Sequence, residues 1–279
     1  MKDELFSLLE WISYYRFIGA NQIILYDNGS TDGTEVIGRC LANYGEITYI
    51  EWPGVEGRKP QTSAYADALT RTSCEWVGFF DLDEFLVLDD GKRLPDFLEV
   101  IPSDVSAIGI NWRIFGSNDQ KIYEPRPVLE RFTSASAENH QFNNHIKTIV
   151  RRNNAIKPLI HTCSVRKGRY IHADGTDISF ISEGRTEKTV QKAARIHHYA
   201  TKSSQEWRVK INRGHANRSD RGARRKRVLL RNFEILDSNE IEDRSALEYR
   251  DGMLAEAERL ADLLRYEGIN YPCWPFKIK

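Results

Sequence analysis

The first 80 residues alternate between helical and strand-like apolar patterns, and this alternation limits the fold more than any other feature. Apolar side chains recur at helical spacing from Leu5 to Phe17, and Gly19 follows where a C-terminal cap is expected. A short apolar strand at residues 22–26 leads into a loop-forming segment. The pattern then predicts a helix at 34–44, a strand at 47–52, a helix at 61–72 and a strand at 76–80. Strands separated by helices indicate an α/β fold with a mixed, mostly parallel sheet flanked by helices.

Beyond residue 100 the pattern changes to strands with few helices between them. Ser203 and Glu206 fit a capping box, which predicts a helix that begins near Ser203. A long charged helix is expected from about Ser245 to Tyr266, within a helical C-terminal extension. The expected strands, added to the sheet in antiparallel fashion, are 105–110, 128–132, 145–151, 164–171 and 194–200.

The composition excludes several classes of protein. The chain has 279 residues, of which 41% are hydrophobic, enough for an ordinary globular core. Forty Lys and Arg balance forty Asp and Glu, which argues against a dedicated nucleic-acid binder. No apolar run approaches the ~20 residues of a membrane-spanning helix, and the first residues lack the order of a signal peptide. We therefore expect a soluble protein. Because the four cysteines are far apart, we also expect reduced thiols and a cytoplasmic location.

Three carboxylates follow the strand at residues 76–80. Asp81, Asp83 and Glu84 stand at the carboxyl end of a buried strand, which is where open α/β sheets bind ligands. Asp81 and Asp83 are two residues apart, so a turn at Leu82 would let both approach one cation. Mg²⁺ or Mn²⁺ held there would suit a diphosphate. The alternative is a solvated acidic turn, because short motifs recur by chance.

Several segments together resemble glycosyltransferase family 92, which is related to the family 2 glycosyltransferases. They are Lys2-Asp3-Glu4, Glu10-Trp11-Ile12, the run from Tyr26 to Thr34, Asp81-Leu82-Asp83-Glu84-Phe85, the run from Asn111 to Ser117, His145-Ile146-Lys147, His161-Thr162-Cys163 and the run from His197 to Ser203 through Arg213-Gly214. The resemblance covers roughly residues 2 to 214. It implies a GT-A fold, a nucleotide-sugar donor with UDP as the expected nucleotide, a divalent metal and inversion at the anomeric carbon.

The resemblance also implies roles for single residues. Asp27 would contact the nucleoside, Asp81 the ribose and Asp83 the metal, although Asp27 also suits a loop-forming role. Of His197 and His198, alternation along a strand lets only one face the metal, and we expect His198 to be that ligand. The other implied contacts are Glu4, Lys147 and Arg213 with the donor, and Trp112 and Phe115 with the acceptor, where core packing is the alternative.

The sequence departs from the family pattern at three places, one of which is Asp3, where relatives usually carry Asn. Relatives usually have a strand before the lysine of the first motif, whereas this sequence begins at Met1. We therefore expect that strand to be missing from a domain at residues 1–214, either because the true start lies upstream or because the copy is truncated. Asn118-Asp119 stands where relatives tend to carry Ser and Gly. As catalytic base we nominate Asp119, with Glu138 and Asp174 as competitors.

A basic segment, residues 208–231, contains ten Lys and Arg and a single acid. It suggests contact with a diphosphate, an anionic acceptor or the anionic inner face of a membrane, within an extension at residues 215–279. The alternative for part of the segment is a solvated helix face. No nucleic-acid motif accompanies it, so we expect no nucleic-acid partner.

The function expected from these features is transfer of a sugar from a nucleoside diphosphate to a saccharide or glycolipid hydroxyl. Two alternatives stay open. A sugar nucleotidyltransferase would normally show a Gly-rich phosphate loop near its N-terminus, and a catalytically inactive scaffold would bind polyanions through the basic segment.

Overall fold

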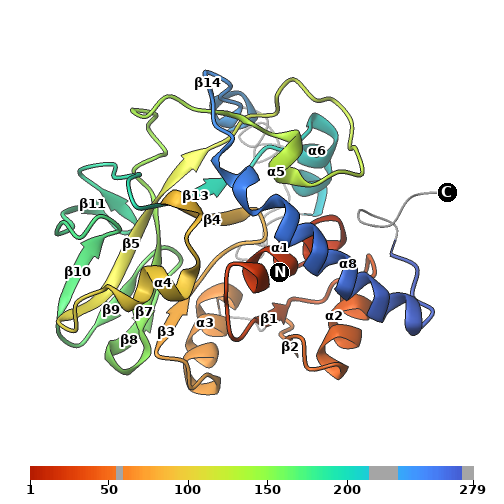
Figure 1. Ribbon diagram of the computed structural model, residues 1–279, viewed down its shortest axis with the longest axis horizontal. Coiled ribbons are helices and arrows are strands. Elements are labelled where there is room, and N and C mark those ends of the chain that lie inside the picture. The colour runs from red at the N-terminus through yellow and green to blue at the C-terminus, as the bar shows by residue number, and fades with distance from the viewer. Residues whose placement is uncertain (55–58, 214–231, 272–279) are drawn as a thin grey trace.

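The computed structural model describes residues 1–54, 59–213 and 232–271 (Figure 1). The first part follows the predicted alternation closely. Its elements are α1 (Leu5–Phe17), β1 (Ile24–Asp27), α2 (Thr34–Asn43), β2 (Thr48–Glu51), α3 (Pro60–Arg71) and β3 (Trp76–Gly78). The later elements are β4 (Glu84–Leu88), α4 (Leu94–Glu99), β5 (Val105–Ile114), α5 (Val128–Arg131), β6 (Ser134–Ala135), β7 (Ile146–Arg151), β8 (Ala155–Pro158), β9 (Cys163–Val165), β10 (Arg169–His172), β11 (Phe180–Ser182), β12 (Arg185–Thr186), β13 (Ala194–His198), α6 (Ser204–Arg213), β14 (Ile241–Glu242) and α8 (Arg250–Tyr266).

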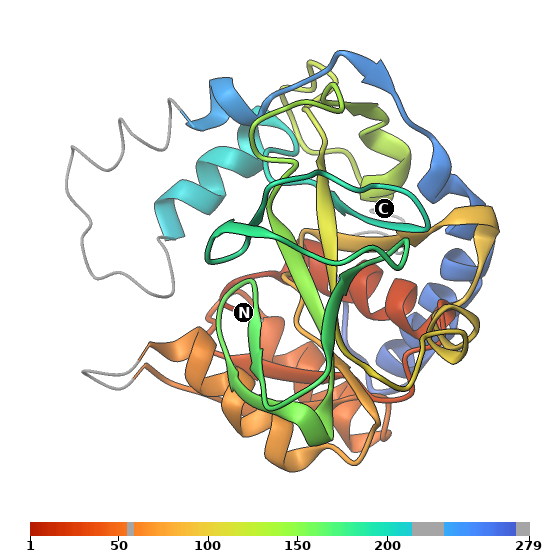
Figure 2. The same cartoon turned by 90° about the vertical axis from the view of Figure 1, so that its left-hand side faces the viewer.

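The central sheet has six strands in the order β3-β7-β5-β13-β4, and β10 pairs with β5 as well (Figure 2). The β3–β7, β5–β7 and β13–β4 pairings are antiparallel, whereas β5 is parallel to β13 and β10. The α/β class is therefore confirmed, but the prediction of a mostly parallel sheet is wrong. The strands of the second half enter between and beside those of the first, so alternation within residues 1–80 does not decide strand direction.

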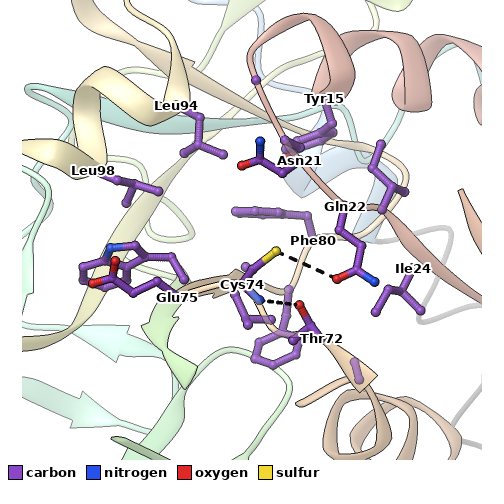
Figure 3. Close-up of a pocket in the computed structure, with 18 of the residues that line it drawn as sticks. Tyr15, Asn21, Gln22, Ile24, Thr72, Cys74, Glu75, Phe80, Leu94 and Leu98 are labelled. Carbon is purple, nitrogen blue, oxygen red and sulfur yellow. Dashed lines mark hydrogen bonds between the residues drawn. The ribbon is translucent and has the colours of Figure 1, made fainter. Parts of the chain in front are cut away.

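β1 and β2 form a separate parallel pair. A cavity of about 670 Å³ lies between β1 and β3, with α3 and α4 contributing to its walls (Figure 3). At one end of β1, the Met1 amino group donates a hydrogen bond to the Tyr26 carbonyl, and the Asn28 amide donates to the Met1 carbonyl. These two bonds are the pattern of a parallel strand pair, with Met1 opposite Asp27.

Helix α1 is the centre of the apolar core. Leu8, Leu9 and Ile12 are fully buried, and α8 lies against α1 on its outer side (Figure 1). Gly252 allows this approach, because a Cβ there would lie 1.9 Å from the ring of Phe17. The described part of the C-terminal extension thus contributes to the same core as the first helix.

Residues 128–131 form helix α5, where the sequence predicted a strand. The buried carboxylate of Glu10 accepts a hydrogen bond from the Val128 amide at 2.7 Å, so a residue far along the chain satisfies the first turn of this helix. No helix in the described part of the chain is long and apolar enough to cross a membrane.

Candidate active site

The turn between β3 and β4 carries the three predicted carboxylates. Its shape is fixed by Trp11 of α1, whose indole Nε1 donates to the carbonyls of Asp81 and Glu84 at 3.0 and 3.2 Å. The Asp81 amide donates to Oε2 of Glu84 at 2.9 Å, which closes the turn. Hydrogen bonds from α1 and within the turn, which a free acidic loop would lack, therefore fix its shape.

Lys147 of β7 lies under this turn and is fully buried. Its Nζ is 2.9 Å from Oδ2 of Asp81 and 3.3 Å from Oε2 of Glu84. Burial raises the pKa of Glu84 to about 8, although the Lys147 ammonium acts in the opposite direction. For Asp81, desolvation is outweighed by Lys147, and the pKa is lowered. Burial alone would lower the pKa of Lys147, but the two carboxylates raise it well above its usual value.

Asp83 faces a different set of groups. Its Oδ2 is 2.6 Å from Nζ of Lys210 on α6, and its Oδ1 is 3.7 Å from Nε2 of His198. Desolvation of Asp83 is outweighed by Lys210 and His198, so its pKa lies well below the usual range. The pair of aspartates thus carries two negative charges that separate cations neutralise.

Strand β13 presents its two histidines to opposite sides. His198 is opposite Glu84 in the antiparallel pairing with β4, and its side chain reaches the carboxylate cluster. His197 is fully buried, its Nδ1 is 3.2 Å from the hydroxyl of Tyr199, and burial lowers its pKa to about 3. The structure therefore brings to the cluster the histidine that the alternation favours.

A small cavity of about 160 Å³ opens beside Asp83, between the start of α1 and α6. Its lining includes Glu4, Asp83, Lys202 and Lys210. Nζ of Lys202 donates a hydrogen bond to Oγ of Ser7. Two ammonium groups next to a carboxylate at a cavity are suited to a ligand with both a cation and phosphate oxygens.

Three predicted ligands have other surroundings. Asp27 is 2% exposed and accepts hydrogen bonds from Ser30 and Tyr49, which is the loop-forming alternative. Phe115 is fully buried against His197 and Tyr199, so core packing replaces the predicted acceptor contact. Lys147 binds carboxylates and has no surface for a phosphate. The side chain of Arg213 and residues 214–231 of the basic segment lie outside the described residues.

Trp112 is 9% exposed and lies beside His198, with 4.2 Å between the ring centroids. The three nominated bases are all exposed, and among the described residues none of them has a hydrogen bond or ion pair with the carboxylate turn. Asp119 is in a turn with φ of 58°, Asp174 accepts two hydrogen bonds from Thr176 in its own turn, and the carbonyl of Glu138 accepts one from Asn143.

Sequence reasoning missed Lys202 and Lys210 as members of the site. In the sequence, Lys210 is recognisable only as one member of the basic segment, residues 208–231. One signal was present, because the predicted helix from Ser203 places Lys210 one turn after Glu206, on the face that begins at the capping box.

The donor set is compatible with a divalent cation. Asp83 and His198 offer an oxygen and a nitrogen, and the buried Nδ1 of His198 has no hydrogen-bond partner among the described residues. Within the described ranges no three His, Cys, Asp or Glu side chains converge as a complete metal cage. A magnesium or manganese ion bound by few protein ligands takes its remaining ligands from phosphates and water.

The fold and the site define an α/β enzyme domain with lysine-paired carboxylates at the end of a sheet strand. The family model of glycosyltransferase family 92 matches residues 2–231. The chain belongs to glycosyltransferase family 92.

Plant proteins of this family are similar to parts of the chain. A family 92 protein of Ricinus communis is 30% identical over 179 residues, which cover 60% of this chain and 31% of that protein. One from Oryza sativa subsp. japonica is 37% identical over 101 residues, 35% of this chain and 17% of the relative. Each aligned segment therefore spans less than a third of the relative's own length.

Proposed function

We propose that the chain transfers a sugar from a nucleoside diphosphate donor, with UDP as the nucleotide, to a hydroxyl of a saccharide or glycolipid. The observation that carries the proposal is Asp83 at the wall of a cavity, between His198 and Lys210. Membership of glycosyltransferase family 92 supports the reaction class.

Asp83 and His198 are the residues that would hold Mn²⁺ or Mg²⁺. When bound, the cation would balance the negative charge that develops on the departing diphosphate. This role suits Asp83, because its pKa lies well below the usual range and its carboxyl is ionised at neutral pH.

The lysines have separate tasks in this proposal. Lys210 and Lys202 at the cavity bind the phosphate oxygens of the donor as cations. Lys147 keeps Asp81 ionised and in place, so that Asp81 accepts hydrogen bonds from the ribose. Trp112 lies against His198 and limits the access of water on that side.

The proposal includes inversion at the anomeric carbon. It also includes a cytoplasmic location, with the basic segment at the inner face of a membrane. Inversion requires a base that takes the proton of the acceptor hydroxyl as that hydroxyl attacks.

A donor panel tests the proposal. UDP-glucose, UDP-galactose and UDP-N-acetylglucosamine are incubated with the protein and octyl glycosides, with Mn²⁺ or with EDTA, and UDP and glycoside products are quantified. Mn²⁺-dependent UDP release with a glycoside product is expected. Pyrophosphate release from a nucleoside triphosphate would instead favour the nucleotidyltransferase, and absence of turnover with every donor would favour the scaffold.

A further inference from the structure

Two histidines contact Trp112 in addition to His198. The ring of His145 stacks on the indole with 5.0 Å between centroids and 14° between planes, and the ring of His161 meets it edge-on at 5.3 Å. The two imidazole centroids are 5.7 Å apart. Trp112 also contacts His198. Lys147, which pairs with Asp81, donates to the carbonyl of Ile160 next to His161, so the pair borders the carboxylate site.

His161 is held in one orientation from three sides. Its Nδ1 lies 3.2 Å from the carbonyl of Ile146, and its amide donates to Oε1 of Glu183. Gly184 packs against the imidazole, because a Cβ there would lie 2.3 Å from Cβ and 3.0 Å from Cδ2 of His161. Gly184 also has a φ of +74°, so the backbone and the contact both require glycine.

This arrangement fixes the chemistry of the His161 ring. A carbonyl only accepts hydrogen bonds, so Nδ1 carries the proton and Nε2 keeps its lone pair. Nε2 has no hydrogen-bond partner among the described residues and is not one of their buried unpartnered atoms, so it is open to solvent. The result is a neutral imidazole with an accessible basic nitrogen.

The charged groups around the ring keep it neutral. Burial and the nearby Lys147 and His145 lower the pKa of His161 to about 4, and Glu183 and Asp81 act in the opposite direction. At neutral pH the ring is therefore unprotonated, and its basicity is close to that of an ordinary carboxylate. Glu84, by contrast, is fully buried, and Asp119 and Glu138 are exposed side chains outside the carboxylate cluster.

We propose that His161 is the general base of sugar transfer, an inference that rests on the proposed function. The acceptor hydroxyl oxygen forms the new bond to the anomeric carbon, and its proton passes to Nε2 of His161. The bond from the anomeric carbon to the diphosphate oxygen breaks, and its electron pair leaves with the nucleoside diphosphate. The imidazolium then releases its proton to water.

His161→Asn tests the assignment, with His145→Asn as the matched control. Asparagine keeps a donor for the Ile146 carbonyl, and His161→Gln serves as the second variant if the first does not fold. With a UDP sugar, Mn²⁺ and an octyl glycoside, kcat should fall at least ~10²-fold in the His161 variant, within the range of a lost general base. The KM for the donor and the thermal shift produced by UDP with Mn²⁺ should stay at wild-type values, and His145→Asn should retain most of kcat.

Rescue separates a base from a structural residue. Free imidazole should restore part of kcat in His161→Ala and leave the wild-type rate unchanged. Unchanged kcat in folded His161 variants, or a loss that imidazole does not restore, would overturn the assignment. If the wild-type protein transfers no sugar from any donor, the proposed function itself fails, which is a different result.

Discussion

Asp81 and Asp83 are two residues apart, yet they contact different cations. Lys147 comes from β7 in the interior of the sheet, and Lys210 comes from α6 at the surface of the cavity. Lys147 is fully buried, whereas the side chain of Lys210 is 37% exposed. The exposed lysine can exchange its carboxylate for a phosphate at low cost, and the buried one cannot. The two aspartates therefore differ in role: in the proposed function Asp81 keeps its ion pair with Lys147 while it contacts the ribose, whereas Asp83 can give up Lys210 to bind the cation.

The first prediction tests this difference at Asp83. Asp83→Asn should fold normally and lose metal-stimulated sugar transfer by ~10²-fold or more, the size of a lost electrostatic stabiliser. The assay is product formation over a series of Mn²⁺ concentrations. Asp90→Asn is the control, because Asp90 is an exposed aspartate in a left-handed turn that asparagine tolerates. Equal activity in the two variants would remove Asp83 from the site.

The second prediction concerns Glu10, which is 4% exposed beneath α5. Burial raises its pKa to about 7 from a usual value of 4.5, against the effect of Lys202. The folded state therefore binds the proton more tightly than the unfolded state does. This contribution is complete below pH 4.5 and is lost as the pH rises through about 7.

Glu10→Gln removes the titration and keeps the side-chain oxygen that accepts from Val128. From pH 4.5 to 8, the free energy of unfolding of the wild type should decrease relative to this variant by about 3 kcal/mol, since each pKa unit is worth ~1.4 kcal/mol. Urea denaturation at several pH values measures the difference. Parallel stability curves for the two proteins would contradict it.

At single residues, the sequence predicts what depends on local geometry. Alternation along a strand distinguishes His198 from His197, and the end of an apolar strand locates Asp83. It does not predict the partners of Asp27 or Phe115, because burial of a side chain depends on segments far along the chain. Tyr49 lies on β2, so its hydroxyl reaches Oδ2 of Asp27 only when β2 pairs with β1.

At the level of elements, helix α6 carries Lys210 to Asp83, so the start of this helix matters for the site. The predicted capping box is confirmed: Oγ of Ser203 accepts from the Glu206 amide at 3.3 Å, and the Ser203 amide donates to the Glu206 carboxylate at 3.1 Å. Glu206 also pairs with the buried Arg131 of α5. The cap thus joins α6 to the rest of the domain.

The third prediction is that Ser203→Ala lowers the free energy of unfolding by ~1 kcal/mol, the usual value of a lost N-cap. It should also weaken binding of UDP with Mn²⁺, because α6 positions Lys210. Ser204→Ala, one residue further, is the control and should change neither quantity by more than ~0.5 kcal/mol. Thermal unfolding and a UDP titration measure the two effects, and equal behaviour of both variants would exclude a role for the cap.

Elements with their own periodicity were predictable, and elements fixed by a distant partner were not. Helix α1 coincides with its predicted bounds, Leu5 to Phe17. The four residues of α5 carry an apolar pattern too short to distinguish strand from helix, and the Glu10 carboxylate decides between them. Likewise, nothing local in residues 105–114 shows that β5 pairs with three other strands.

For the whole molecule, the separation of β1–β2 from the six-stranded sheet is the main departure from a continuous α/β sheet. β3 is the last strand of the larger sheet, and the cavity of about 670 Å³ separates it from β1. Leu25 and Asp27 direct their backbone groups toward β2, so those of Ile24 and Tyr26 point toward this cavity. The bonds of Met1 to Tyr26 and Asn28 already follow the geometry of a strand on this side.

The last prediction is that an extended segment joined before Met1 fills the cavity as a strand parallel to β1. The second residue before Met1 would donate to the Ile24 carbonyl and accept from the Tyr26 amide, continuing the register that Met1 begins. A five-residue extension of Val, Ile and Thr should therefore raise Tm by at least about 2 °C, the shift that ~1 kcal/mol produces in a domain of this size. It should also slow hydrogen exchange at the Tyr26 amide. The matched control carries proline at the second position before Met1, where the missing N–H prevents the bond to Ile24. If neither extension slows exchange at the Tyr26 amide, the cavity does not hold a strand. If both extensions raise Tm equally, the stabilisation comes from apolar contact and not from strand pairing.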